Sequence, residues 1–474
     1  MTASWVNSAE LIGVDLHLEL SGSGGRRAAL AAALRQAVQS GRLAPGTRLP
    51  PYRALAADLG VARNTVADAY AELVAEGWLT ARQGSGTRVA ERARPLGGAR
   101  RTPEPAPAPA EGPRHQLRQG VPDASAFPRT DWTAAYRRAL NSAPTTAFGP
   151  GDPHGRIELR TALTEYLARS RGVRADPERI VVCSGFAHGL RLLFGERVLR
   201  GPLAVEAYGL GFHRDLLARA GVRTVPLTVD QDGARVDELD GMDGVRGVLL
   251  TPAHQFPTGG PLHAERRAAV VDWARARGGL VVEDDYDGEF RYDRKPVGAV
   301  QGLDPERVLY LGSVSKSLSP ALRLGWMVLP RRLVPGVLAA KGEREAWAST
   351  LDQLALAEFL RSGAYDRHVR RMRQRYRGRR DHLVRALAGR APHVEVTGIA
   401  AGLHAVLRLP PGSERSVVRA AAERGIAVDG LAEFRHPLAT GPVEDGLVVG
   451  YAAAAEHAYG AAVEALCEVL PPER

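Results

Sequence analysis

The stretch "GSVSKSLSPALRLGW" (residues 312–326) places one lysine, Lys316, among serines, with Arg323 seven positions further on. Lysine is rare in this chain: lysine and arginine total 63, yet the only lysines are Lys295, Lys316 and Lys341. Arginine keeps its proton and cannot form a Schiff base, whereas a lysine amine can. A lysine at 316 therefore favours a site that needs an amine, against the alternative of an ordinary surface lysine.

This stretch follows the last of several short apolar runs that recur between helical stretches. The runs are residues 179–185, 201–206, 244–252, 278–286 and 307–315. Short buried strands that alternate with helices predict an α/β domain with a mainly parallel central sheet and helices on both faces. Ligands of such sheets bind at the carboxyl ends of the strands. We therefore expect functional side chains just after each run.

The residues at these strand ends are polar. "SGFAHG" (184–189) offers a hydroxyl and backbone N–H groups at the start of an expected helix, a suitable place for a phosphate. His254 and Gln255 lie in a proline- and glycine-rich turn, and Tyr286 follows a strand together with several acids. Acids that leave a buried strand favour a cation partner over a solvated loop.

One cofactor needs all of these groups, namely pyridoxal 5′-phosphate (PLP). Its aldehyde needs a lysine, and its ring nitrogen needs an acid that keeps it protonated. Its phosphate needs hydroxyls, backbone amides and an arginine. We expect Lys316 to form the Schiff base, and Ser313 with Arg323 to hold the phosphate.

The N-terminal block has a different pattern. Residues 24–94 contain eleven arginines against five acids. Apolar spacing and glycine stops predict helices over 26–41, 52–60 and 61–77, followed by a hairpin over 78–90. Two short helices with a tight turn between them, then a hairpin, form a winged helix-turn-helix. The alternative is a solvated helical bundle with ordinary surface arginines.

The second helix of this motif would enter a major groove with its first turn. That turn holds Arg63, Asn64 and Thr65, and arginine and asparagine can pair with guanine and adenine. Flanking residues would contact phosphates and position the domain without reading sequence. The expected flanking set is Arg48, Arg53, Arg82, Gly84 and Arg88.

A proline- and alanine-rich segment separates the two blocks. "PLGGARRTPEPAPAPAEGPRH" (95–115) contains six prolines and few large apolar residues. Such composition predicts an extended spacer, although a long loop inside one domain is the alternative. We expect a DNA-binding domain over 1–92, a linker over 93–115 and an effector domain over 116–474.

Composition narrows the class further. The chain has 474 residues, a net charge of +10 and only two cysteines, Cys183 and Cys467. Two cysteines predict a reducing cytoplasm with no disulfide framework and no metal site. The first twenty residues lack a signal-peptide pattern, and no apolar run reaches the roughly 18 residues of a membrane span. The positive charge favours a polyanion partner such as DNA.

These motifs resemble one family. Residues 46–89 resemble the DNA-binding domain of GntR-family transcription regulators. Residues 150–173, "TPAHQFPTG", "EDDYDGEFRY" and "SKSLSPALRLG" resemble, in order, motifs of the MocR-type subfamily. In that subfamily a linker joins a winged helix to a fold-type I aminotransferase-like PLP domain. The resemblance implies this fold, with a smaller C-terminal α+β subdomain.

The resemblance also implies roles for single residues. Asp284 would pair with the pyridine nitrogen, and Tyr286 would hydrogen-bond the ring hydroxyl. Gly185 and Phe186 would lend backbone amides, while His254 and Gln255 would line the ring. The complete expected cofactor set is Ser184, Gly185, Phe186, His254, Gln255, Asp284, Tyr286, Ser313, Lys316 and Arg323.

The effector domain departs from the family pattern at two places. Leu210 stands where a tyrosine near the cofactor is usual, and Tyr208 is its possible substitute. Asp445 and Gly446 stand where aminotransferases place an arginine for the substrate carboxylate, and Arg435 is a poor positional match. Because of these departures, the sequence supports an amino-acid ligand less strongly than it supports PLP.

The DNA-binding domain departs from the pattern at the two helix starts. Tyr52 and Ala62 replace small polar residues that commonly cap these helices. Loss of a cap costs about 1 kcal/mol. The fold should survive, without phosphate contacts from those hydroxyls.

The expected function is a PLP-linked, sequence-specific DNA-binding transcription regulator, homodimeric by analogy with the subfamily. Its effector domain would sense PLP, or an amine or amino acid that reacts with PLP, and would act as a sensor and not as an enzyme. One variant is a regulator of vitamin B6 synthesis with PLP as the signal. The alternative is an active aminotransferase that carries a DNA-binding head.

Overall fold

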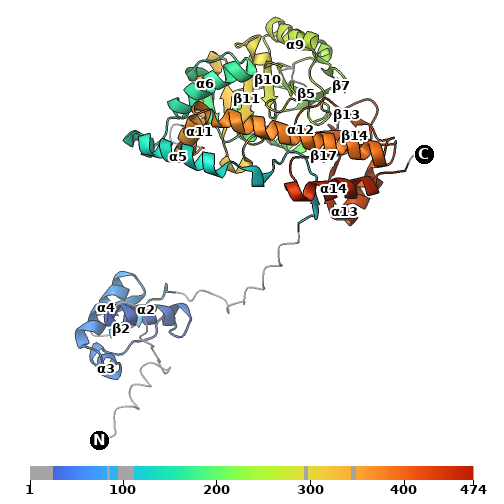
Figure 1. Cartoon of the computed structure of the whole chain (residues 1–474). Coiled ribbons are helices and arrows are strands. Elements are labelled where there is room, and N and C mark those ends of the chain that lie inside the picture. Colours follow the sequence, from blue (N-terminus) through green and yellow to red (C-terminus); the bar gives the residue numbers. More distant parts are fainter. Residues whose placement is uncertain (1–24, 83–85, 94–111, 293–296, 343–347, 473–474) are drawn as a thin grey trace. The chain divides into compact units, whose positions relative to one another are not determined.

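The computed structural model describes residues 25–82, 86–93, 112–292, 297–342 and 348–472. The chain separates into two compact units, with the division after Ala110 (Figure 1). Each unit is therefore described by itself. Most of the expected linker lies outside the described residues.

The first unit is a winged helix-turn-helix. Leu30, Leu34, Val66 and Leu73 are buried at helical spacing, which explains why these segments pack as helices around one core. In the antiparallel hairpin that follows these helices, Leu79 of the first strand pairs with Val89 of the second. The elements are α2 (Arg26–Gln39), α3 (Tyr52–Asp58), α4 (Arg63–Ala75), β1 (Leu79–Arg82) and β2 (Gly86–Val89).

The start of α3 differs from the sequence-based expectation. Pro51 and not Tyr52 is the N-cap, and Tyr52 is the first helical residue. The Tyr52 ring instead packs edge-on against Tyr70, with ring centroids 5.3 Å apart. Ala62 is the N-cap of α4 and has no side-chain cap hydrogen bond. Packing of Tyr52 thus adds a contact at the start of α3, whereas α4 begins uncapped.

The second unit contains a central seven-stranded sheet in the order β4-β12-β11-β10-β9-β5-β6. Every neighbouring pair is parallel except the two that involve β12, which runs antiparallel to β4 and β11. The strands are β4 (Ile180–Cys183), β5 (Leu203–Glu206), β6 (Thr224–Leu227), β9 (Gly247–Leu250), β10 (Leu280–Asp285), β11 (Val308–Ser313) and β12 (Gly325–Val328).

Alternate residues of the central strands pack into two different cores. Val182, Tyr310 and Trp326 join a cluster with α5 (Arg129–Ser142), α6 (Ile157–Arg171) and α11 (Thr350–Arg361). Their neighbours Val181 and Met327 join a second cluster with α8 (Gly211–Arg219) and α10 (Val334–Lys341). The sheet is therefore buried on both faces, as its near-continuous apolar strands predict.

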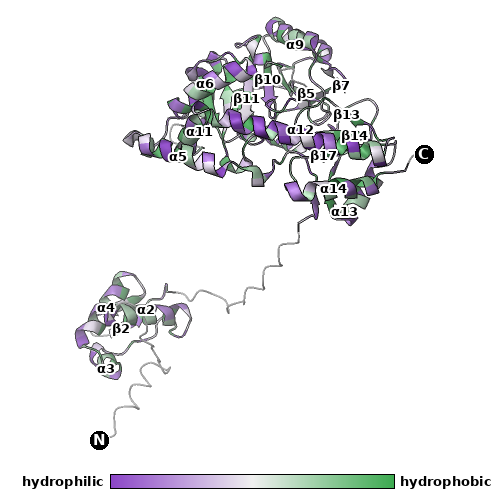
Figure 2. Ribbon diagram, viewed as in Figure 1, coloured by the Kyte–Doolittle hydropathy of each residue, from purple (hydrophilic) through white to green (hydrophobic). Residues whose placement is uncertain are grey.

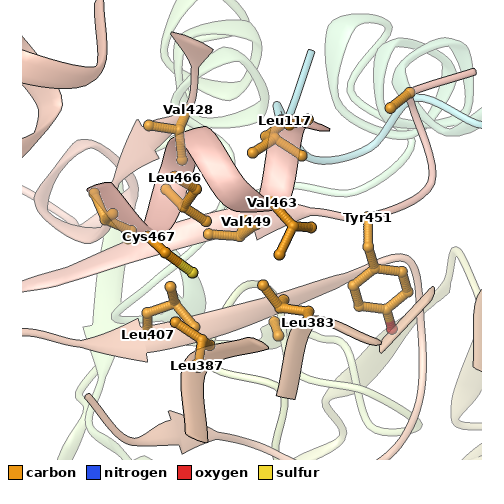
Figure 3. Close-up of a cluster of buried hydrophobic side chains, with 14 of the residues drawn as sticks. Leu117, Leu383, Leu387, Leu407, Val428, Val449, Tyr451, Val463, Leu466 and Cys467 are labelled. Atoms are coloured by element: carbon orange, nitrogen blue, oxygen red, sulfur yellow. The ribbon is translucent and has the colours of Figure 1, made fainter. Parts of the chain in front are cut away.

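A smaller α+β subdomain follows. Its antiparallel sheet has the order β13-β14-β17-β16, and its core includes Leu383, Leu407, Val449 and Leu466 (Figure 3). The long helix α12 reaches it from the large subdomain and is mostly hydrophilic along its length (Figure 2). The elements are α12 (Ala364–Arg390), β13 (Val396–Thr397), β14 (His404–Arg408), α13 (Glu414–Glu423), β16 (Asp429–Gly430), β17 (Gly446–Gly450) and α14 (Glu456–Val469).

A short segment at the start of the second unit joins this subdomain. Strand β3 (His115–Gln116) pairs in parallel with β15 (Ile426–Ala427). Cys183 and Cys467 are buried free thiols. Within the described ranges, no helix has the length and apolar character that a membrane crossing requires.

Candidate functional site

A cavity of about 280 Å³ opens at the carboxyl ends of the parallel strands, where ligands of such sheets bind. Its volume is near the lower end of the roughly 300–1,000 Å³ that small-molecule sites occupy. The strand-end residues in its wall are Ser184, Glu206, Thr251, Asp284, Tyr286, Ser313 and Lys316. Five separate strands therefore deliver polar groups to one place.

Lys316 lies in the turn after β11 and lines the cavity. Its amine donates a hydrogen bond to the backbone carbonyl of Gly120. Burial lowers the pKa of Lys316 below its ordinary value, although Asp287 and Asp284 oppose this shift. A lowered pKa leaves more of the amine neutral, and the neutral amine is the form that reacts with a carbonyl carbon.

Asp284 is the acid of β10 that faces the same cavity. Burial raises its pKa well above the ordinary value, with Asp285 adding to the shift and Lys316 opposing it. A carboxyl group in such a place is stabilised as an anion when a cation joins it. The protonated nitrogen of a pyridine ring would be such a cation, so Asp284 fits the acid that PLP needs.

Tyr286 also lines the cavity, and its hydroxyl contacts His254, which lies outside the cavity wall. His254 Nδ1 lies 3.0 Å from the Tyr286 hydroxyl and 2.9 Å from Asp287 Oδ2. Burial, with help from Asp287 and Asp284, raises the pKa of Tyr286 well above its ordinary value. Tyr286 is therefore a neutral phenol, able to donate to an oxygen on a bound ring.

His254 and Gln255 are not in the cavity wall, in contrast to the expectation that they line the ring. Both are almost fully buried. Gln255 Nε2 donates to the backbone carbonyls of Phe256 and Tyr208 at 2.7 and 3.1 Å, and its Oε1 accepts from Thr258 Oγ1 at 2.6 Å. Both side chains therefore lie one layer behind the wall, where Gln255 supports its own turn and the loop after β5, and His254 supports the segment after β10.

The other end of the cavity suits an anion. Gly185 has a left-handed φ of 110° and is the N-cap of α7 (Phe186–Leu190). The Ser184 amide donates to His188 Nδ1 at 3.0 Å, and burial lowers the pKa of His188 to about 4. A neutral His188 therefore fixes the orientation of Ser184, while Gly185 turns the chain toward the cavity.

Ser313 and Arg323 lie at the same cavity. Ser313 ends β11, and Arg323 immediately precedes Leu324 and β12. Arg323 is exposed and adopts a left-handed φ of 51°. The donor set of Ser184, Gly185, Ser313 and Arg323 has the chemistry that a phosphate needs.

Sequence reasoning missed His213 and Arg214, which line the cavity from the first turn of α8. The His213 ring lies 4.7 Å from the Phe186 ring between centroids. Burial, with help from Lys316 and Arg214, lowers the pKa of His213 to about 4. Arg214 Nη1 donates to the carbonyls of Gly209 and Phe434 at 2.6 and 3.1 Å. They lie seven and eight residues beyond Glu206 at the end of β5, too far from the strand end for the rule that pointed to the other residues.

The expected DNA contacts form an exposed set on the first unit. Arg63 and Asn64 are exposed at the start of α4, and Thr65 is half-buried. Arg48 pairs with Arg88 through an isolated backbone bridge, and Arg88 Nη1 donates to Gly46 O at 3.0 Å. Arg53 and Arg82 are also exposed. Gly84 lies outside the described residues.

A winged helix-turn-helix and a fold-type I aminotransferase-like unit in one chain define a class of two-domain regulator. Residues 26–89 match the family described as "Bacterial regulatory proteins, gntR family", and residues 117–443 match "Aminotransferase class I and II". The chain belongs to the MocR-type subfamily of GntR-family transcription regulators.

Two relatives illustrate this membership. The chain is 33% identical to the HTH-type pyridoxine biosynthesis transcriptional regulator PdxR of Corynebacterium glutamicum, over 88% of this chain and 90% of that protein. It is 34% identical to the probable rhizopine catabolism regulatory protein MocR of Rhizobium meliloti, over 88% of each. The alignments therefore include both units.

Solved structures match the second unit. A kynurenine aminotransferase of Pyrococcus horikoshii has a TM-score of 0.68 at 24% identity, and covers 75% of this chain and 90% of its own. LysN, an α-aminoadipate aminotransferase of Thermus thermophilus, has a TM-score of 0.66 at 26% identity, covering 75% and 91%. The fold of the second unit is thus that of PLP enzymes.

Proposed function

We propose that this protein is a PLP-linked transcription regulator whose winged helix binds promoter DNA and whose aminotransferase-like unit binds PLP as its sensing group. One observation carries the proposal. Lys316, Asp284 and the Ser184–Gly185 turn meet around one cavity, in a chain whose other unit is a winged helix. A homodimer that reads paired half-sites would follow from the family.

The residues around the cavity fit PLP by their chemistry. Asp284 would hold the proton of the ring nitrogen, and Tyr286 would donate to the ring oxygen. Ser184, Ser313, Arg323 and the Gly185 and Phe186 amides would hold the phosphate. PLP supplies an aldehyde that combines with amines and a ring that withdraws electrons. Lys316 would hold the aldehyde carbon and keep the cofactor in place.

The class of effector depends on whether the cavity wall contains a cationic side chain that could bind a carboxylate. Asp445 accepts a hydrogen bond from the Gly412 amide at 2.6 Å, and Arg435 Nη2 donates one to Gly441 O at 3.0 Å. Neither Asp445 nor Arg435 lines the cavity. An apolar cluster of Phe256, Val406, Leu431, Phe434 and Val448 packs against Tyr286, and of these five residues only Phe256 lines the cavity.

This arrangement favours PLP itself, or an amine without a carboxylate, as the signal. The name of the PdxR relative, a pyridoxine biosynthesis regulator, supports the version in which PLP is the signal and vitamin B6 synthesis is the target. An amino-acid effector would need another cation, and Arg214 already donates to three backbone carbonyls, those of Gly209, Phe434 and Arg435.

An active aminotransferase is the second candidate. Lys316 and Asp284 are the two groups that transamination needs from a protein, and both face the cavity. Turnover of an amino donor faster than with free PLP would support this candidate. The position of Arg435 outside the cavity wall weighs against it, because a substrate carboxylate in the cavity would need a charged partner.

The testing experiment compares DNA affinity of the protein stripped of PLP and then reloaded, using the promoter region beside its own gene. The salt concentration is fixed because phosphate contacts make affinity salt-dependent. A change in affinity on reloading would identify PLP as a signal. Tight binding without change would leave PLP as a built-in reagent for another amine, and absence of DNA binding in both forms would refute the regulator.

A second measurement tests the lysine. PLP bound through Lys316 should give a visible absorbance that differs from that of free PLP. Lys316→Ala should abolish this absorbance, and persistence of the absorbance in the variant would show that another amine holds the cofactor.

A further inference from the structure

The amine of Lys316 has a backbone partner that comes from the first residues of the second unit. It donates to the carbonyl of Gly120, and both Gln119 and Gly120 line the cavity. Gly120 has a left-handed φ of 80°, and a Cβ built there would lie 3.1 Å from the Lys316 amine. Only glycine therefore allows this turn to approach the lysine so closely.

Residues 112–120, which we name the strap, run from the end of the linker to this contact. The His115 amide donates to Gly425 O at 3.0 Å, and the Leu117 amide donates to Ala427 O at 2.9 Å. On the other edge, the Gly450 amide donates to Leu117 O at 2.7 Å. Leu117 is fully buried in the core of the small subdomain (Figure 3).

The chain beyond Gly120 is held by charged hydrogen bonds, whereas the strap is held by backbone hydrogen bonds and the burial of Leu117. Asp123 is almost fully buried and accepts hydrogen bonds from Arg375 at 2.8 Å and Arg379 at 3.1 Å, both on α12. Within the strap, the exposed Arg118 lies 3.3 Å from Asp429 outside it, and exposed ion pairs contribute little. A displacement of Gly120 would therefore pass toward Leu117 and β3 more easily than toward Asp123.

We propose that the Lys316 amine holds the strap in place, and that a ligand which occupies this amine releases the strap. The proposal rests on the proposed function, in which PLP is the ligand that takes up the lysine nitrogen. Loss of the donor leaves the partly buried Gly120 carbonyl without this partner at the cavity wall. A carbonyl that loses its partner away from bulk solvent is unfavourable, so the turn moves and the hydrogen bonds of Leu117 open more often.

A change in the chemical state of Lys316 would thereby change the hydrogen bonding of the first described residues after the linker. No contact with the winged-helix unit is needed for this first step. It gives the linker end of the second unit two states, and a signal can only act through such a difference between states.

Amide hydrogen exchange of the full-length protein tests the proposal. The reporting segments are the strap and the end of β17, because the Gly450 amide is bonded to the strap. Lys316→Met removes the amine while keeping the length of the side chain. We expect exchange in both segments to rise by roughly tenfold to a hundredfold, the effect of losing a hydrogen bond to a charged group. PLP should produce the same rise in the wild type and no further rise in the variant.

Lys341→Met is the matched control. Lys341 is also buried and donates to two backbone carbonyls, Pro153 O at 2.5 Å and Val182 O at 2.7 Å. Its replacement should raise exchange near those residues and leave the strap unchanged. A rise in the strap in this control as well would mean general loosening of the unit, and would overturn the proposal.

The outcomes separate the strap from the proposed function. Suppose that PLP binds without changing exchange in the strap, and that Lys316→Met also leaves this exchange unchanged. The strap proposal would then be wrong, and the PLP-linked regulator would still stand. If PLP does not bind at all, the PLP proposal fails. The comparison of the two lysine variants without PLP then still decides whether Lys316 holds the strap.

Discussion

Gly325→Ala should damage the cofactor site without replacing any residue that would bind the cofactor. Gly325 begins β12 and packs against the turn that precedes α7. A Cβ at this position would lie 2.8 Å from Gly185 Cα, 2.9 Å from Gly185 N and 3.0 Å from Gly312 O. All three are backbone atoms of elements held in the sheet or at its end, so none can move aside by a side-chain rotation.

The size of the effect follows from these distances. To restore an ordinary contact of 3.4 Å, Gly185 Cα must move by about 0.6 Å from its 2.8 Å position. Overpacking of this kind costs roughly 1–3 kcal/mol of stability. The same shift would lengthen an amide–phosphate hydrogen bond from about 2.9 to about 3.5 Å, where it ceases to count as one. Loss of one such bond weakens binding by roughly tenfold to a hundredfold.

The assay is a titration of the stripped protein with PLP, followed by absorbance, together with urea unfolding. Gly460→Ala is the control, since Gly460 lies within α14 and a Cβ there would meet no atom within 4 Å. This control should gain roughly 0.5–1 kcal/mol of stability and bind PLP like the wild type. If Gly325→Ala binds PLP with wild-type affinity and stability, the turn at Gly185 does not depend on its approach to β12.

Three further predictions concern both units. Arg63→Ala should relax base preference at one operator position, whereas Arg88→Ala should weaken binding to every sequence alike; equal effects of both on all DNAs would remove Arg63 as a reader. Ala62→Ser should supply the missing cap of α4 and stabilise the first unit by about 1 kcal/mol, measured by calorimetry of the full chain with Ala62→Gly as control. His368 Nε2 donates to Ser317 O at 2.8 Å, and burial lowers the pKa of His368 to about 4. Because this folded pKa is below the unfolded one, the contribution of His368 is complete above about pH 6.5 and lost toward pH 4, by roughly 3 kcal/mol. The stability difference between wild type and His368→Gln should shrink by that amount between pH 7 and pH 4, and a constant difference would contradict the lowered pKa.

The strands that could be predicted from the sequence are those that are buried, parallel and followed by polar groups. β4, β5, β9, β10 and β11 all lie within the predicted apolar runs. β6 and β12 were not predicted. "TVPL" in β6 contains a proline, which is typical of an edge strand and weakens the pattern. β12 follows the Lys316 loop so closely that its apolar residues read as a continuation of that motif.

The contacts that depend on distant chain segments could not be predicted. Gly120 precedes Lys316 by 196 positions, and no local pattern marks its carbonyl as a partner of the amine. His213 reaches the cavity because α8 begins just after the loop that follows β5. His254 and Gln255 show the converse difference. Their position after a strand suggested the cavity wall, yet His254 bonds Asp287 and Tyr286 in the segment after β10. Gln255 bonds backbone carbonyls of its own turn and of the loop after β5, so both side chains lie behind the wall.

The rarity of lysine was informative, but not sufficient by itself to identify the cofactor lysine. Lys341 is also buried, and its compact ammonium donates to two backbone carbonyls. A planar guanidinium presents its donors in a fixed fork and cannot replace such a point charge in a tight space. Both described lysines are therefore places where arginine would fail, for different reasons. Only Lys316 stands at the strand ends with Asp284 in the same cavity wall. The acid nearby, and not the scarcity of lysine, is what makes Lys316 the candidate for the cofactor amine, while the contacts of Lys341 are structural.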